Sequence, residues 1–123
     1  MKVLQVASAL NDWGGIERYV VFLGTGLERR GHQVQLTRPA GSPLSSRWKG
    51  ASIDLRSHGK TDFRAFRAYL RLFRQESFDI IHLHFTPDLL VTAGAARIAK
   101  AGKVVMTRHV AVPWSRPKAA LYM

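Results

Sequence analysis

Short apolar segments alternate along the whole chain with longer stretches in which apolar side chains recur every three or four residues. The short segments are rich in β-branched residues and predict strands, at 2–8, 33–37, 51–55, 79–83 and 103–107. The longer stretches predict helices, at 16–30, 61–76 and 86–101. This alternation is typical of a parallel sheet covered by helices on both faces. We therefore expect an α/β fold with a Rossmann-like parallel sheet.

Residues that start and stop helices refine this outline. Gly31 follows the first predicted helix, where glycine commonly ends a helix, and Thr61 is expected to cap the second. Residues 86–88 (Thr-Pro-Asp) are expected to begin the third helix, with the threonine as its cap, and Gly102 is expected to end it. The Gly-, Pro- and Ser-rich stretch 39–50 is expected to be a loop.

The composition narrows the class of protein. A chain of 123 residues is long enough for one domain with a hydrophobic core. It contains no cysteine, which excludes disulfides and thiolate metal sites and fits a reducing, cytoplasmic setting. No apolar run approaches the ~20 residues needed to span a bilayer, and the first residues are more typical of a strand than of a signal peptide. The net charge of +11 predicts attraction to nucleic acid, acidic lipid headgroups or phosphorylated substrates.

Uncommon residues gather where three of the predicted strands end. Residues 11–17 follow the first strand, 82–88 span the end of the fourth, and 107–109 follow the fifth. Ligands of open parallel sheets bind outside the carboxyl ends of the strands, near the point where the strand order reverses. We therefore expect a binding site at this edge of the sheet.

A glycine pair, Gly14 and Gly15, stands just before the first predicted helix. Glycine lets the backbone approach a ligand closely, and the free N–H groups of the following helix suit a phosphate or diphosphate. The spacing is not the G-x-G-x-x-G fingerprint of dinucleotide sites. A tight turn from strand to helix, with Glu17 as a favourable acid in the first helical turn, explains the same residues. Both interpretations stay open on this motif alone.

Three histidines fall near the same edge. His82 and His84 share one side of the fourth strand, because side chains alternate along a strand. Two imidazoles can bind a metal, but no third ligand is evident, so no metal site is predicted. One of the two is expected to be a core histidine, and His84, nearer the strand end, is the better functional candidate. His109 follows the fifth strand, where its imidazole can bond a sugar hydroxyl or lie in a surface loop.

Four segments of the chain carry a resemblance to a known family. They are 14–18 (GGIER), 27–34 (LERRGHQV), 79–84 (DIIHLH) and 104–109 (VVMTRH). Their order and spacing resemble those of the amino-terminal domain of the GT-B glycosyltransferases of family 4, and the resemblance covers nearly the whole chain.

This resemblance implies a retaining, two-domain transferase that uses a nucleotide sugar as substrate and needs no metal or cofactor. Its acceptor would be a glycan, a lipid-linked or lipopolysaccharide-type molecule, or a small polar compound. On this likeness Gly14 and Gly15 lie by the donor diphosphate. His109 corresponds to the family histidine of the catalytic site that contacts the transferred sugar. Glu17 and His84 would line the acceptor cleft.

The sequence also departs from the family pattern at several positions. Val110 stands where the family often has glycine, and Gly24 and Gly26 replace the usual helix formers. A helical glycine is about 1 kcal/mol less favourable than alanine, and close packing against the sheet is a candidate reason for it. A further helix is expected to open at Ser115, and the donor-binding second domain is absent from the sequence. We therefore expect a truncated or fragmentary domain that transfers no sugar alone.

The predicted helix 61–76 carries a basic stripe beside an apolar one. The basic stripe consists of Arg64, Arg67, Arg71 and Arg74. The apolar stripe is expected to consist of Phe63, Phe66, Leu70 and Phe73. The pattern favours an ordinary helix that packs on the sheet and turns its charges to solvent. The alternative is a surface for anionic lipid headgroups, which would place the protein peripherally at the inner face of a membrane.

Two other classes of function compete with sugar transfer. The charge suits a basic nucleic-acid-binding module, but the sequence has no helix-turn-helix, zinc-finger or RNP motif, so no specific nucleic acid partner is expected. A non-catalytic nucleotide-binding module would carry a phosphate fingerprint or an acidic cluster after the first strand. Asp12 is a single acidic residue rather than a cluster, so it gives that class little support.

Overall fold

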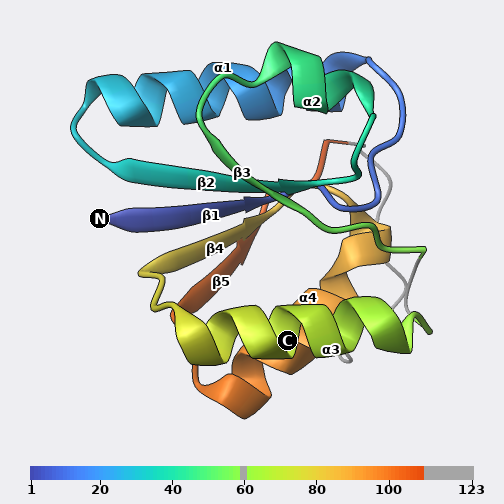
Figure 1. Cartoon of the computed structure of the whole chain (residues 1–123). Coiled ribbons are helices and arrows are strands. Elements are labelled where there is room, and N and C mark those ends of the chain that lie inside the picture. Colours follow the sequence, from blue (N-terminus) through green and yellow to red (C-terminus); the bar gives the residue numbers. More distant parts are fainter. Residues whose placement is uncertain (59–60, 110–123) are drawn as a thin grey trace.

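Five parallel strands form one sheet, and helices cover both of its faces (Figure 1). The computed structural model describes residues 1–58 and 61–109. Within these ranges the strands are β1 (Lys2–Val6), β2 (Gln33–Arg38), β3 (Ala51–Asp54), β4 (Ile80–Leu83) and β5 (Lys103–Met106). The helices are α1 (Gly15–Arg29), α2 (Pro43–Arg47), α3 (Phe63–Gln75) and α4 (Thr86–Ala99). The predicted α/β, Rossmann-like fold is confirmed.

β1 lies at the centre of the sheet. The strand order is β3-β2-β1-β4-β5, so β1 pairs with β2 on one side and with β4 on the other. The chain builds outward from β1 to β3 and then returns to the other side of β1 for β4. The strand order therefore reverses between β1 and β4, and the carboxyl ends of these two strands flank the place where sheets of this kind bind ligands.

Each face of the sheet has its own hydrophobic core. α1 and α2 lie over one face, and α3 and α4 lie over the other (Figure 1). Leu4 and Val6 of β1 belong to the core beneath α3 and α4, whereas Ala7 belongs to the core beneath α1 and α2. Residues 3–6 of β1 are all buried, which is the pattern of a parallel strand covered on both faces.

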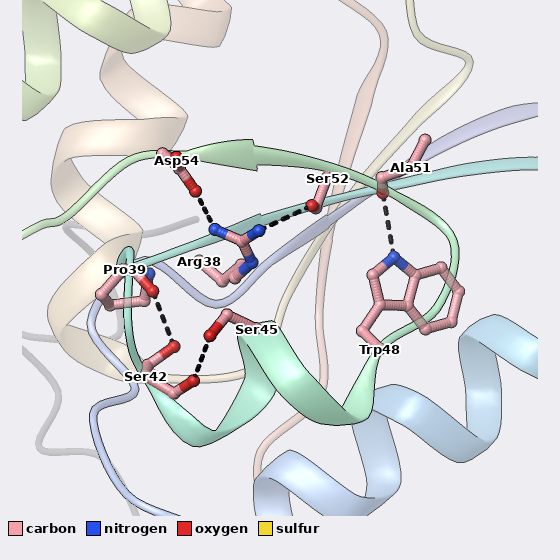
Figure 2. A network of polar contacts seen from close by, with 8 residues as sticks. All are labelled: Arg38, Pro39, Ser42, Ser45, Trp48, Ala51, Ser52 and Asp54. Carbon is pink, nitrogen blue, oxygen red and sulfur yellow. Dashed lines mark hydrogen bonds and ion pairs between the residues drawn. The ribbon is translucent and has the colours of Figure 1, made fainter.

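Within the described residues, all predicted strands and helices are present, and their ends fall within two residues of the predicted ones. The loop predicted at 39–50 is wrong in part, because α2 occupies its middle. Pro43 starts this helix, and Ser42 Oγ donates to the carbonyl oxygen of Pro39 at 2.7 Å just before it (Figure 2). Burial of Leu44 holds the helix against the sheet. No helix in the described part of the chain is long and apolar enough to cross a bilayer.

Trp48 follows α2 and explains one of the helical glycines. Its indole N–H donates to the carbonyl oxygen of Ala51 at 2.9 Å (Figure 2). The residue is 6% exposed. The ring lies against α1, where a Cβ added to Gly24 would be 2.7 Å from a ring carbon. A Cβ added to Gly50 would be 2.5 Å from the same indole. Gly26 has no such neighbour within 4 Å, so close packing accounts for Gly24 and not for Gly26.

The caps of α3 and α4 differ from the prediction. Asp62, not Thr61, caps α3, and its Oδ1 accepts a hydrogen bond from the backbone N–H of Ala65 at 3.0 Å. That bond lowers the pKa of the Asp62 carboxyl. A carboxylate suits this place because the helix dipole favours a negative charge at its start. Thr86 is the first residue of α4 rather than its cap, which is Phe85.

The end of α4 also differs. Lys100, with a left-handed φ of 53°, ends the helix, whereas Gly102 was expected to do so. Gly102 has another role, since a Cβ there would lie 2.0 Å from the carbonyl oxygen of Phe78. The glycine therefore lets the connection from α4 to β5 pass close to the segment that enters β4. Val110 and the helix predicted at Ser115 lie outside the described residues.

The buried stripe of α3 is rotated from the predicted one. Ala65, Tyr69 and Phe73 face the core at spacings of four, and Tyr69 is fully buried. Phe63 was expected in this stripe and is 78% exposed, while Phe66 is half-buried. Phe73 belongs to both rows, and Phe66 and Leu70 also pack against the core, so only Phe63 was placed wrongly. Helical spacing alone fitted both rows.

Candidate functional site

The carboxyl ends of β1, β4 and β5 bring the predicted site residues to one edge of the sheet. α1 begins at Gly15 after the loop that follows β1, His84 follows β4 directly, and His109 lies just past β5. Because all the strands are parallel, these three segments share the same edge. β1 and β4 are the neighbours between which the strand order reverses.

Gly14 and Gly15 form the turn into α1. The backbone N–H of Gly14 donates to Oε2 of Glu17 at 2.9 Å, and Glu17 is only 6% exposed. The Glu17 carboxylate therefore faces the turn rather than the solvent. Gly15 is exposed, and a Cβ added there would have no atom within 4 Å. Glycine at the cap has no side chain to accept from the first-turn N–H groups, so a ligand or water can bind them.

Four side chains are in contact at this edge and form what we call the histidine cluster: Gln5, Tyr19, His84 and His109. The rings of His84 and His109 are stacked at 5.5 Å, and His84 Nδ1 is 3.3 Å from His109 Nε2. His84 Nε2 is hydrogen-bonded to Oε1 of Gln5 in β1. Tyr19 of α1 contacts the rings of His84 and His109 edge-on, at 5.7 and 4.9 Å. The cluster thus joins three strands to the helix that follows the glycine turn.

Burial sets the charge of the strand histidines. His84 is 1% exposed, and burial, with repulsion from His82 and His109, lowers the pKa of its imidazole to about 3. Burial also lowers the pKa of His82, whose Nε2 lies 2.7 Å from Thr107 Oγ1. The His82 and His84 rings are 4.1 Å apart, which disfavours a charge on either. His84 is therefore the core histidine of the pair, and it is also the one that reaches His109.

Comparison with known proteins identifies the family. A family model described as Glycosyltransferase Family 4 matches residues 13–123. The chain belongs to glycosyltransferase family 4. Among solved structures, MurG of Acinetobacter baumannii is similar in fold, with a TM-score of 0.73 and 14% sequence identity over 98% of this chain. The family 4 chain spans 39% of the length of that MurG chain. No curated protein matches the sequence.

These matches confirm the family and the fold inferred from the four sequence segments. The family 4 domain has the architecture of the amino-terminal part of a GT-B glycosyltransferase. The family match begins at Trp13 and so includes the glycine turn and all three histidines of this edge. The individual roles of Gly14, Gly15, Glu17, His84 and His109 stay predictions.

Sequence reasoning missed a buried polar network beneath the same edge of the family 4 domain. Ser8 Oγ donates to Oδ1 of Asp88 at 2.5 Å, and the backbone N–H of Ala9 donates to Oδ2 at 3.3 Å. The Tyr69 hydroxyl donates to Ser8 Oγ at 2.6 Å and lies 2.8 Å from Thr37 Oγ1. The network ties the loop after β1 to the end of β2, to α3 and to the start of α4.

Asp88 is the charged member of this network. It is fully buried, and burial raises the pKa of its carboxyl to about 6 against the lowering effect of its bonds to Ser8 and Ala9. The sequence placed this acid in the first turn of a helix, and that position alone accounted for it. Its partners lie about eighty residues away along the chain, and no local pattern marks them.

No metal site is evident in the parts of the chain that the structure describes. Within residues 1–58 and 61–109, no group of three His, Cys, Asp or Glu side chains is arranged to hold an ion. The nitrogens of His84 contact Gln5 and His109 instead. That the family 4 domain works without a metal or cofactor stays a prediction.

Proposed function

We propose that this domain is the acceptor-side half of a retaining glycosyltransferase that moves a sugar from a nucleotide-sugar donor to a glycan, a lipid-linked molecule or a small polar acceptor. One observation carries the proposal: an open glycine turn at a helix start and a cluster of imidazoles share one edge of the sheet. The turn suits a diphosphate, and the imidazoles suit hydroxyl groups. A nucleotide sugar presents both kinds of group, covalently joined.

Each residue has a defined part in this proposal. The first-turn N–H groups behind Gly15 bind the diphosphate, since Gly15 is exposed and Gly14 already donates to Glu17. Glu17 holds the glycine turn in shape rather than contacting the sugar. His109 is half-buried and contacts the transferred sugar, while His84 supports it from the core. The nucleotide itself would be bound mainly by a second domain, so we expect no sugar transfer by the 123-residue chain alone.

A titration followed by NMR tests this assignment. Nucleotide sugars carrying different bases and hexoses are added at millimolar concentration, with the matching nucleosides as controls. We expect the Gly15 amide and the His109 ring resonances to shift together with at least one nucleotide sugar and not with its nucleoside. Identical shifts with the nucleoside, or no shift at either residue with any donor, would contradict the proposal. Turnover by the chain alone would contradict the need for a second domain.

We also propose that α3 faces an anionic membrane surface. Arg64, Arg67, Arg71 and Arg74 are all exposed, and none takes part in an ion pair within the described residues. Phe63 is 78% exposed at the start of the same helix. With Phe66, Leu90, Val91 and Gly94 it lines a largely apolar groove of about 270 Å³ between α3 and α4, whose lining also includes Thr61 and Asp62. Exposed aromatic and basic side chains on one helix fit a lipid interface. Such a surface suits a cytoplasmic enzyme with a lipid-linked acceptor.

Vesicle cosedimentation tests the membrane proposal. Replacing Arg64 and Arg67 with serine should reduce binding to anionic vesicles by roughly thirtyfold, because each basic residue near the surface contributes about 1 kcal/mol. Replacing Arg29 and Arg30 with serine is the matched control, since both are exposed at the far end of α1. Equal loss in the two double variants would indicate attraction by net charge alone. Equal binding of the unmodified chain to neutral vesicles would remove the electrostatic argument.

A further inference from the structure

A hydrogen-bonded row of three side chains ends at His109. Gln5 of β1 comes first, His84 at the end of β4 second, and His109 after β5 third. His84 Nε2 contacts Oε1 of Gln5, and His84 Nδ1 is 3.3 Å from Nε2 of His109. Gln5 and His84 are each only 1% exposed, so water cannot replace these bonds without opening the sheet edge.

The chemistry of the groups gives the row a direction. A neutral imidazole carries one N–H and one lone pair, and a carboxamide oxygen can only accept. His84 is neutral because burial lowers the pKa of its imidazole to about 3. With Gln5 Oε1 facing it, His84 carries its proton on Nε2 and accepts at Nδ1. The facing Nε2 of His109 must then carry a proton and donate, which leaves Nδ1 of His109 as a hydrogen-bond acceptor.

We infer that Gln5 and His84 are positioning residues that hold His109 in the Nε2–H tautomer, so that its Nδ1 accepts from a ligand hydroxyl. Nothing in the local sequence joins Gln5 to His109, which lie at opposite ends of the described chain. The edge contact of Tyr19 with the His109 ring, at 4.9 Å, restricts rotation of that ring. An acceptor nitrogen selects a group that donates, such as a sugar hydroxyl, over a carboxylate or phosphate. This last consequence rests on the proposed function; the tautomer does not.

Long-range ¹H–¹⁵N NMR of the unmodified chain tests the tautomer directly, at a pH above the ordinary imidazole pKa and with no sugar present. A free imidazole exchanges between tautomers and shows averaged ring nitrogens. We expect limiting values instead at both His84 and His109, with Nε2 protonated and Nδ1 unprotonated in each ring. A scalar coupling between His109 Nε2 and His84 Nδ1 should be visible through the hydrogen bond. Averaged nitrogens at His109, or protonation at its Nδ1, would overturn the inference.

A matched pair of variants tests the part of Gln5. Gln5→Leu removes the oxygen that orients His84, and the ring nitrogens of His109 should move to averaged values. Gln35→Leu makes the same change in β2. Gln35 is paired in register with Leu4, so it shares the face of Leu4 and not the face of Gln5. This variant should leave His109 unchanged. An unaltered His109 in folded Gln5→Leu would overturn the role of Gln5, and the unmodified chain decides the tautomer if that variant does not fold.

The two proposals fail separately. Sugar binding together with averaged His109 nitrogens would overturn the tautomer and leave the sugar site standing. A fixed Nε2–H tautomer with no response to any nucleotide sugar would support the positioning row and count against the proposed function.

Discussion

The indole of Trp48 lies so close to Gly24 that a single added carbon there would be 2.7 Å from the ring. The ring has no room to retreat, because Gly50 is equally close to it and its N–H is bonded to Ala51. This contact joins α1 to the end of α2 and closes the core on that face of the sheet. Gly24 and Gly26 of the same helix therefore differ, because only Gly24 lies against the ring.

Gly24→Ala should destabilise the fold, whereas Gly26→Ala should stabilise it. Overpacking of a held ring costs typically 1–3 kcal/mol, so we expect a loss of about 2 kcal/mol in the free energy of unfolding for Gly24→Ala. Alanine at the uncrowded Gly26 should add about 0.5–1 kcal/mol through helix propensity and a less flexible unfolded chain. Urea denaturation of both variants measures the difference. Stabilisation by both substitutions would show that Trp48 is free to move.

The elements of the fold could be predicted because they depend on local patterns. β1 and β4 are short apolar runs, and apolar residues recur every three or four positions along α1. Trp48 could not be placed this way, since it lies in a stretch rich in turn residues and its neighbours come from α1. The same limit applies to Tyr69, which helical spacing alone did not distinguish from the Phe63 row. Long-range packing decided both cases.

Asp88 should make the domain less stable as the pH rises from about 4 to about 6. Its folded pKa of about 6 lies above the ordinary value of 3.8, so in this window the unfolded state releases a proton that the folded state keeps. A difference of about two pKa units corresponds to about 3 kcal/mol in the free energy of unfolding. Asp88→Asn removes the titrating group and should abolish this dependence.

The difference between the two unfolding curves is the quantity to measure for Asp88. Asn has one carbonyl oxygen where the carboxylate accepts from both Ser8 and Ala9, so the variant also loses a hydrogen bond at every pH. That loss is a constant offset of about 1 kcal/mol. Urea titrations between pH 4 and 7 should therefore show the variant gaining on the unmodified chain as the pH rises. A constant difference across this range would mean that the carboxyl titrates normally.

His84 should have the opposite effect on the stability of the domain, over a wider range of pH. Its folded pKa of about 3 lies below the ordinary 6.5, so below pH 6.5 the unfolded state takes up a proton that the folded state refuses. Stability should fall as the pH decreases from about 6.5, by up to roughly 1.4 kcal/mol per pH unit. His84→Gln should reduce this slope, and the remainder comes from His82, whose pKa burial also lowers. His58→Gln is the control, because His58 is exposed, and it should keep the slope of the unmodified chain.

The edge that holds the candidate site could also be predicted from the sequence, for a topological reason. Parallel strands bring their carboxyl ends together, so any uncommon residues after them must meet. What the sequence did not contain was the partner of each side chain. His84 was placed correctly on its strand, but its bond to Gln5 spans 79 residues. The Ser8–Asp88 bond spans 80 residues, and neither has a periodic signature.

Glu17 should protect the amide of Gly14 from hydrogen exchange, because its carboxylate accepts that N–H at 2.9 Å in a buried setting. Glu17→Ala removes the acceptor, which should speed exchange of this amide at least tenfold and lower stability by about 1 kcal/mol, as expected for a lost helix cap. Glu17→Gln retains an oxygen that can accept the bond and should keep most of the protection. Hydrogen exchange followed by NMR resolves the Gly14 amide in all three chains. If exchange is equally fast in Glu17→Gln and Glu17→Ala, the negative charge rather than the hydrogen bond alone holds the turn.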